Sequence, residues 1–168
     1  MLRRQGARPC LLRLDDIRRE IVPEPRYTED ERDIVYRALA LMARILAGEG
    51  VPVVVDATAH RRRWREMVSV AIPRFLEVRV DCPLEVCMRR EASRPEGAVM
   101  ADLYRRAIER RDGLADHPGL GEVIGVDVPY EPSPDAFAID AVGRSPAESA
   151  RSILEEMRRR GWLPHGRG

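Results

Sequence analysis

Short apolar segments alternate with longer segments of helical periodicity along most of the chain. Four apolar segments predict buried strands, at residues 11–14, 51–55, 75–80 and 136–139. This alternation is typical of a parallel sheet that is covered by helices on both faces. The pattern therefore predicts an α/β fold, and no internal repeat or change of composition divides residues 1–168 into two domains.

The longest helix is predicted over residues 29–47, where apolar side chains recur at intervals of three and four. Thr28 and Glu31 have the spacing of a capping box, and Gly48 follows the last apolar position. The apolar residues of this helix predict one stripe that faces the core: Ile34, Val35, Ala38, Leu41, Met42 and Ile45.

Further helices are predicted over residues 61–72, 83–90 and 100–111 and after Ser145. In the last of them Ser145 can cap the helix, Pro146 suits its first turn and Glu148 completes a capping box. Residues 93–134 form a long polar excursion that bears arginines. In a compact domain such an excursion is often a lid over a site, and an ordinary surface loop is the alternative.

Composition narrows the class of protein. Of the 168 residues 44% are hydrophobic and 34% are charged, which excludes a disordered chain, and no apolar run is long enough for a bilayer. A net charge of +1 argues against a nucleic-acid partner. Three cysteines without CxxC spacing indicate reduced thiols, and the first residues lack the pattern of a secretory signal. We therefore expect a cytoplasmic protein without a membrane partner.

Polar residues follow the predicted strands, at the edge of a parallel sheet where ligands bind. Asp15 follows the first strand, and its carboxylate can accept a hydroxyl proton or help to hold Mg²⁺ during phosphoryl transfer. Thr58 follows the second strand and can bind a phosphate. Helix capping is the alternative role for both side chains.

Two arginines near these strand ends can recognise an anion. Arg18 and Arg32 can bind phosphate or sulfate through paired hydrogen bonds, or can lie on a solvated helix face. His60 is followed directly by three arginines, at residues 61–63, whose positive charge disfavours a protonated imidazole. We do not expect His60 to be the catalytic base.

Four stretches of the chain resemble the adenylyl-sulfate kinase family. Residues 11–18 (LLRLDDIR) are similar to the family's LLDGDNVR, and residues 27–32 (YTEDER) to its F-S-x-E-D-R. Residues 75–87 (FLEVRVDCPLEVC) are similar to FIEVYVDTPLEVC, and residues 125–132 (GVDVPYEP) to GIDSPYEAP. The order of these motifs is that of the family, and together they cover most of the chain.

The resemblance implies a phosphate-loop kinase fold, in which a three-layer parallel sheet is flanked by helices. It implies transfer of a phosphoryl group from ATP, with Mg²⁺, to the 3′-hydroxyl of adenylyl sulfate, in a homodimer. By position, it assigns Asp15 and Thr58 to catalysis and no residue to direct metal binding. It assigns three arginines to binding of the acceptor: Arg18, Arg32 and Arg37. It assigns Arg90 and Arg105 to binding of the nucleotide; Arg105 lies within residues 103–107 (LYRRA), which resemble the family's LYKKA.

The sequence departs from the family pattern at several positions. Val35 stands in place of an asparagine, Ala101 and Asp102 in place of the lid's lysine and glycine, and Val123 in place of an aromatic residue. An aromatic ring at position 123 would stack on a purine. A related kinase that acts on another small hydroxylated acceptor is therefore an alternative.

The largest departure concerns the nucleotide phosphates. No G-x-x-x-x-G-K-[ST] motif occurs in the chain, so the glycine-rich loop that cradles them is missing. Residues 1–9 instead resemble the end of the helix that follows this loop. We expect the chain to begin within that helix and to lack the first strand. A protein that binds the acceptor without holding ATP is the alternative from another functional class.

Overall fold

The computed structural model describes residues 2, 8–92 and 102–163, within which strands and helices lie close to their predicted positions. The predicted start of one helix, at residue 100, lies outside the described residues. In chain order the elements are β1 (Cys10–Arg13), α1 (Leu14–Ile21), α2 (Glu29–Gly48), β2 (Val53–Asp56), α3 (Arg62–Ser69), β3 (Val78–Asp81), α4 (Leu84–Ala92), α5 (Leu103–Arg111), β4 (Phe137–Asp140) and α6 (Pro146–Arg159).

The strands form two parallel pairs, β1 with β2 and β3 with β4. Among the described residues no strand joins β2 to β3, and apolar side chains on these strands are open to solvent. Val54 and Val55 of β2 and Val80 of β3 are all exposed. The predicted parallel α/β architecture is confirmed, with its sheet divided into two halves.

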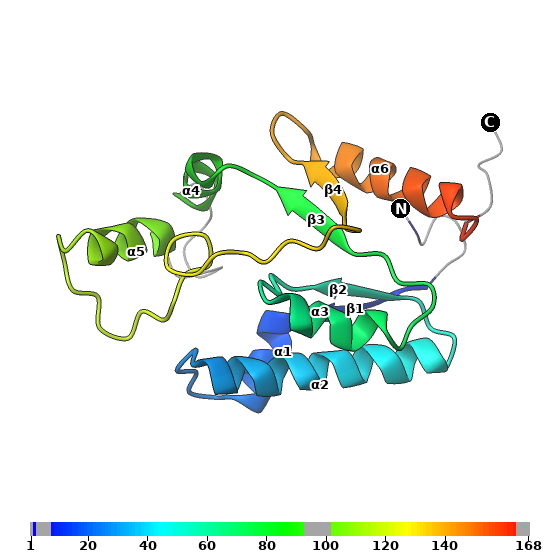
Figure 1. Cartoon of the computed structure of the whole chain (residues 1–168), viewed down its shortest axis with the longest axis horizontal. Helices are drawn as coiled ribbons and strands as arrows, with labels where there is room; N and C mark the ends of the chain where they lie inside the picture. The colour runs from blue at the N-terminus through cyan, green and yellow to red at the C-terminus, as the bar shows by residue number, and fades with distance from the viewer. Residues whose placement is uncertain (1, 3–7, 93–101, 164–168) are drawn as a thin grey trace.

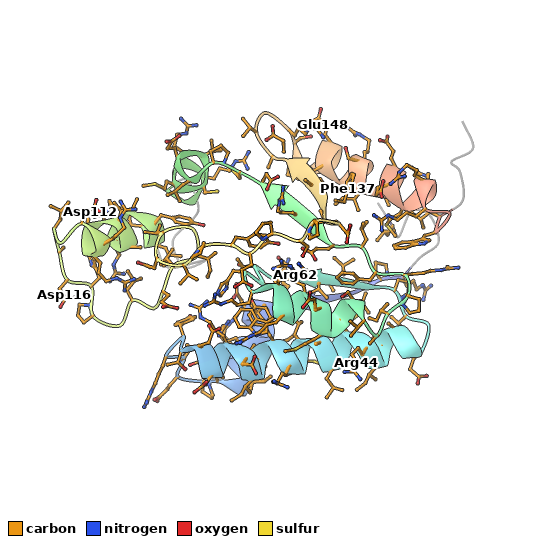
Figure 2. All side chains as sticks on the ribbon, viewed as in Figure 1. Arg44, Arg62, Asp112, Asp116, Phe137 and Glu148 are labelled. Carbon is orange, nitrogen blue, oxygen red and sulfur yellow. The ribbon has the colours of Figure 1, made fainter. Side chains whose placement is uncertain are left out.

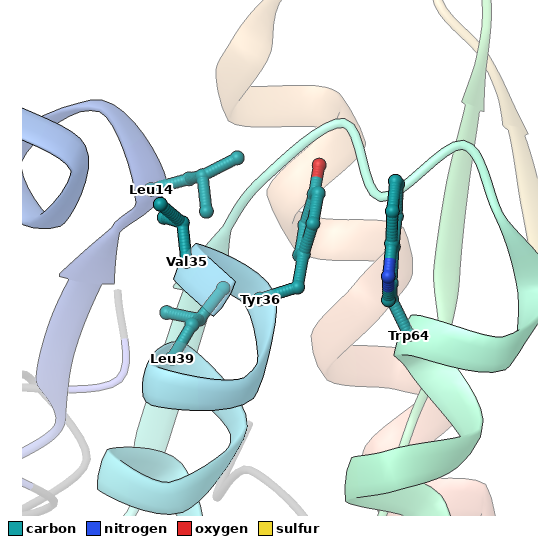
Figure 3. Packing of buried hydrophobic residues seen from close by; sticks show 5 residues of the cluster. All are labelled: Leu14, Val35, Tyr36, Leu39 and Trp64. Atoms are coloured by element: carbon teal, nitrogen blue, oxygen red, sulfur yellow. The ribbon is translucent and has the colours of Figure 1, made fainter. Parts of the chain in front are cut away.

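Helices flank the strands on both sides. Figure 1 shows α2 along one side of the molecule and α6 along the opposite side, with the strands between them. The main core lies where α1, α2 and α3 meet beside β1 and β2. It contains five buried side chains, drawn in Figure 3: Leu14, Val35, Tyr36, Leu39 and Trp64.

The prediction that the apolar stripe of α2 faces the core is wrong, because a different face of the helix is buried. Tyr36 is buried and stacks on Trp64 with ring centroids 4.1 Å apart. Burying an aromatic pair stabilises the fold more than burying one aliphatic side chain, so this face of α2 turns inward. Three members of the predicted stripe consequently lie on the surface: Ile34, Leu41 and Ile45 are 58%, 52% and 57% exposed.

The two predicted capping boxes have different outcomes. At α6 the box is confirmed, because Ser145 Oγ accepts from the Glu148 backbone N–H at 3.2 Å and Glu148 Oε2 accepts from the Ser145 N–H at 2.7 Å. At α2 only one half forms, in which Thr28 Oγ1 accepts from the Glu31 N–H at 3.3 Å. The Glu31 carboxylate turns to the residues before Thr28 instead.

A buried arginine of α3 connects the two strand pairs. Arg65 pairs with Glu77, which precedes β3, at 2.8 Å, and donates to Ser133 Oγ at 3.0 Å. It also donates to the Glu131 carbonyl and lies over the Tyr130 ring, 4.7 Å from the centroid. The segment before β4 is thereby fastened to both halves of the sheet.

The described part of the polar excursion, residues 102–134, has a small core of its own. Ala107 of α5 packs with Leu120 and Val123 of the following loop. In Figure 1 α5 and this loop extend to the left of the strands. The role of a lid stays a prediction. Among the described residues no helix has the length and apolar character that a membrane crossing requires.

Candidate acceptor site

The ends of β1 and β2 place two of the predicted catalytic residues on the same edge of the sheet. β1 pairs with β2 in parallel, with Arg13 opposite Asp56, so the segments that carry Asp15 and Thr58 both leave the sheet at this edge. Both side chains are exposed. The capping alternative is wrong for both, since the N-caps of α1 and α3 are Arg13 and Arg61.

Arg18 is buried on α1, where it is 6% exposed. Its Nη1 donates to Glu31 Oε1 at 3.2 Å, and its guanidinium lies over the Tyr27 ring, 5.1 Å from the centroid. Its Nε is also buried, and no described residue accepts a hydrogen bond from it. The prediction of a solvated helix face is wrong for Arg18, which retains a donor that a ligand can satisfy.

Arg32 is likewise buried, at the start of α2, where it is 5% exposed. Its Nε donates to the Tyr27 carbonyl at 3.0 Å and its Nη2 to the Glu122 carbonyl at 2.9 Å. The alternative of a solvated helix face is therefore wrong here too. Arg32 joins the start of α2 to the loop of the polar excursion, 90 residues further along the chain.

Glu31 organises the turn before α2. Its Oε2 accepts from the backbone N–H groups of Arg26, at 2.6 Å, and Tyr27, at 3.1 Å, while its Oε1 holds Arg18. Tyr27 has a left-handed backbone, with φ of 57°. Gly121 fits closely beside it, because an added Cβ would lie 2.7 Å from Tyr27 Cβ. The turn and the excursion therefore meet at a position that only glycine occupies without a shift.

An aromatic group lies behind this cluster, at the turn after β2. The Tyr36 hydroxyl accepts from the Ala59 N–H at 2.8 Å, at a residue with a left-handed φ of 41°. Burial raises the pKa of Tyr36, while the hydrogen bond from Ala59 and the charges of Arg18 and Arg32 lower it. Figure 3 shows the Tyr36 ring parallel to that of Trp64. Tyr36 thus fixes the turn that carries Thr58, a role that sequence analysis missed.

His60 is completely buried in the same turn, with its ring edge-on to Trp64 at 4.9 Å. Burial, together with the charges of Arg32 and Arg61, lowers the pKa of His60 to about 4. Neither ring nitrogen has a hydrogen-bond partner among the described residues. This geometry agrees with the prediction that His60 is not the base.

A cavity of about 540 Å³ opens beside Tyr27, the residue that contacts both Arg18 and Arg32. Arg110 of α5 shapes its wall, pairing with Asp127 at 2.8 Å, and Asp127 Oδ2 in turn accepts from the Val123 N–H at 2.7 Å. The cavity is lined by residues of the turn before α2 and of the excursion: Arg26, Tyr27, Thr28, Glu29, Arg110, Leu120, Gly121, Glu122 and Asp127.

The structure does not place the other predicted arginines next to Arg18 and Arg32. Arg37 is exposed on α2 and pairs with Asp33 at 2.5 Å. Arg90 of α4 donates to the Ala141 carbonyl at 2.8 Å, beyond β4 in the other half of the sheet. Arg105 of α5 pairs with Asp102 and Glu109. Within residues 2, 8–92 and 102–163, no group of three or more His, Cys, Asp or Glu side chains is placed to hold a metal ion.

Comparison with known proteins adds to this geometry. The sequence model of the adenylylsulphate kinase family matches residues 1–138. A probable adenylyl-sulfate kinase of Pyrococcus abyssi is 30% identical over 164 residues, which are 97% of this chain and 85% of that protein. An adenylyl-sulfate kinase of Synechococcus sp. (strain JA-3-3Ab) is 32% identical over 151 residues, covering 89% and 76% of the two chains.

The fold is similar to that of a solved structure. The structure of the Mycobacterium tuberculosis APS kinase CysC in complex with AMPPNP and APS matches 94% of this chain and 84% of that chain. The TM-score is 0.69 at 24% sequence identity, so this likeness concerns the fold.

Proposed function

Because the chain belongs to the adenylylsulphate kinase family, we propose that it binds adenylyl sulfate and takes part in ATP-dependent phosphorylation of its 3′-hydroxyl. The observation that carries this proposal is the pair of buried arginines, Arg18 and Arg32, around Tyr27. A buried guanidinium recognises sulfate and phosphate oxygens strongly, because water does not compete for its donors. The unpaired Arg18 Nε supplies one such donor.

The proposed reaction uses the exposed carboxylate at the end of β1. Asp15 accepts the proton of the 3′-hydroxyl while the oxygen attacks the terminal phosphorus of ATP, and ADP leaves with the electrons of the broken bond. Thr58 lies at the same edge to contact the transferred group. Mg²⁺ is expected to arrive on the ATP phosphates, since it commonly binds through substrate oxygens with few protein ligands. We expect this reaction in the cytoplasm.

The chain has fewer groups available to bind ATP than to bind the acceptor. Arg90 and Arg105 are assigned to the nucleotide by position in the family motifs, and both are engaged within the protein. The sequence lacks the glycine-rich motif that would surround the phosphates. The engagement of Arg90 and Arg105 within the protein favours a second candidate function, in which the chain binds adenylyl sulfate without using ATP. The replacement at Val123 favours a third, in which a related acceptor is phosphorylated.

Isothermal titration tests the acceptor site first. Adenylyl sulfate should bind to the full chain, and Arg18→Met should weaken binding at least about tenfold, as expected for the loss of a charged hydrogen bond. Arg151→Ala, which removes an exposed arginine of α6, is the matched control and should leave affinity unchanged. If adenylyl sulfate does not bind to the wild-type chain, the acceptor assignment is wrong.

A coupled assay of ADP release then separates the candidates. Turnover that requires adenylyl sulfate, ATP and Mg²⁺ together supports the kinase. Acceptor binding without ADP release or ATP binding supports the second candidate. ADP release with another hydroxylated nucleotide, but not with adenylyl sulfate, supports the third. Asp15→Asn should abolish turnover in either kinase while leaving acceptor binding nearly intact, because the amide cannot take the proton.

A further inference from the structure

The turn that follows β2 carries Thr58 on a strained backbone. Ala59, the next residue, has a φ of 41°, in the left-handed region that a residue with a Cβ seldom occupies. A left-handed backbone at such a residue persists only where its surroundings hold it. The direction in which Thr58 extends from this turn therefore depends on contacts from neighbouring elements.

Two helices hold Ala59 through its backbone. The Tyr36 hydroxyl of α2 accepts a hydrogen bond from the Ala59 N–H at 2.8 Å, and Arg65 of α3 donates to the Ala59 carbonyl. The two contacts act on different peptide groups. The Ala59 nitrogen belongs to the planar group that joins it to Thr58, so Tyr36 fixes the backbone of Thr58 directly. The contact from Arg65 acts one peptide group further along the chain.

Tyr36 is itself held firmly in the core. It is 4% exposed, and its ring stacks on Trp64, as Figure 3 shows, with ring centroids 4.1 Å apart. Trp64 Nε1 donates to Oδ1 of Asp33, one turn before Tyr36 on α2, at 3.0 Å. Because both α2 and α3 fix the ring, its hydroxyl is a stationary point to which the turn is attached.

The Tyr36 hydroxyl also lies near the side chains of the proposed reaction. Burial raises the pKa of Tyr36, the hydrogen bond from Ala59 and the charges of Arg18 and Arg32 lower it, and the charge of Asp15 raises it. The buried arginines and the carboxylate at the end of β1 thus all act on this hydroxyl. Tyr36 is therefore close both to the proposed acceptor site and to the turn that carries Thr58.

We propose that Tyr36 is a positioning residue for phosphoryl transfer, which directs Thr58 toward the transferred group through the Ala59 N–H. This inference rests on the proposed function, in which Thr58 contacts that group. Without the hydroxyl, the peptide group between Thr58 and Ala59 can rotate toward an unstrained backbone, and Thr58 moves with it. A small displacement of a positioned group slows a reaction strongly. Tyr36 therefore affects the transfer step more than the binding of adenylyl sulfate.

Tyr36→Phe tests this inference, because it removes the hydroxyl and keeps the ring on Trp64. In the coupled assay of ADP release kcat should fall about tenfold, whereas the Kd of adenylyl sulfate, from isothermal titration, should change by less than about twofold. Ser152→Ala is the matched control. It removes a hydroxyl of α6 that donates to the carbonyl of Glu148, labelled in Figure 2, and should leave both constants unchanged. Urea denaturation checks that both variants are folded.

Hydrogen exchange of the Ala59 amide tests the contact without any turnover. Exchange at this amide should accelerate in Tyr36→Phe and stay unchanged in Ser152→Ala, because only the first variant removes the acceptor of its hydrogen bond. An Ala59 amide that exchanges equally slowly in Tyr36→Phe and in the wild type would show that the hydroxyl does not hold the turn, and would overturn the inference.

A double variant separates positioning from a general loss of structure. Thr58→Ala should lower kcat, and in that background Tyr36→Phe should lower it by less than about twofold further, because the group that Tyr36 positions is already absent. Equal losses in the two backgrounds would overturn the inference, as would a Tyr36→Phe variant whose only defect is a raised Kd. An active wild type that Tyr36→Phe leaves unchanged would overturn this inference alone. A wild-type chain without turnover would overturn the proposed function together with it.

Discussion

The two halves of the divided sheet differ in how they are supported. The acceptor half, formed by β1, β2 and α1 to α3, contains a closed cluster of aromatic and aliphatic side chains. The distal half, formed by β3, β4, α4 and α6, has no comparable cluster among its described residues. Ile139 and Leu154 are buried there, while Val80 is 61% exposed. The acceptor half thus holds Arg18 and Arg32 beside a closed core, with one further contact from Arg32 to the Glu122 carbonyl of the excursion, while the distal half has fewer buried side chains to support it.

This difference explains why the acceptor residues converge while the predicted nucleotide residues do not. Arg18 and Arg32 extend from helices that pack directly against the core, so their guanidinium groups are buried with defined partners. Arg90 and Arg105 lie on separate short helices outside that core. A binding group is positioned only as well as the element that carries it.

The largest effect is expected from a matched pair of leucines. Leu39 and Leu154 are similarly buried, at 4% and 6% exposure, in the acceptor half and the distal half respectively. Leu39→Ala should lower the free energy of unfolding by about 4 kcal/mol, because its closed surroundings cannot collapse into the cavity, and Leu154→Ala by only about 2 kcal/mol. Urea denaturation measures both. Equal losses would show that the distal half is packed as tightly as the acceptor half.

The connection between the halves should be broken by removing Arg65. Arg65→Met removes the positive charge that pairs with the Glu77 carboxylate, which keeps only hydrogen bonding such as that from Ser133, and should cost roughly 3 kcal/mol. The halves should then unfold separately. In a Trp162→Phe background, Trp64 fluorescence reports the acceptor half and should persist at urea concentrations where circular dichroism already falls. Arg62→Met, on the same helix, removes only an exposed pair with Glu66 and should keep the transitions coincident.

Sequence periodicity located the strands and helices, and the rule that ligands bind beyond parallel strand ends pointed to Asp15 and Thr58. Periodicity did not predict which face of α2 packs against the core, because that helix carries apolar residues on two faces and their spacing alone does not distinguish the buried face. Tyr36 was missed for the same reason. The hydrogen bond from Arg32 to the Glu122 carbonyl could not be predicted from the sequence either. Every residue has a backbone carbonyl, so nothing in the sequence marks the one, 90 residues away, that accepts this bond.

Acidification should weaken the acceptor half through His60. Its pKa of about 4 in the folded protein lies below the ordinary value of 6.5, so the unfolded chain binds more protons between these values. Stability is therefore lost as the pH falls from about 6.5 through 4, by roughly 2 kcal/mol between pH 7 and pH 4.5. His60→Phe keeps a buried ring next to Trp64 and removes this titration.

The measurement is the difference in unfolding free energy between wild type and His60→Phe across that range. Carboxylates with lowered pKa, such as Glu148 and Asp33, also contribute less stability in acid, but they do so in both proteins and cancel in the difference. The gap should widen toward pH 4.5. If this difference in unfolding free energy stays constant with pH, His60 has the same pKa in the folded and the unfolded protein.

The smallest effect concerns the helix caps, one in each half. Ser145→Ala removes both hydroxyl contacts of a complete capping box and should cost about 1 kcal/mol. Thr28→Ala should cost less, about 0.5 kcal/mol, because Glu31 holds the preceding turn through two backbone N–H groups that remain after the substitution. Hydrogen exchange should show faster opening confined to the first turn of α6 for Ser145→Ala, since the distal half has little packing to hold that turn. Exchange that accelerates equally throughout both halves would mean that they open together, and that the difference between them lies in composition and not in stability.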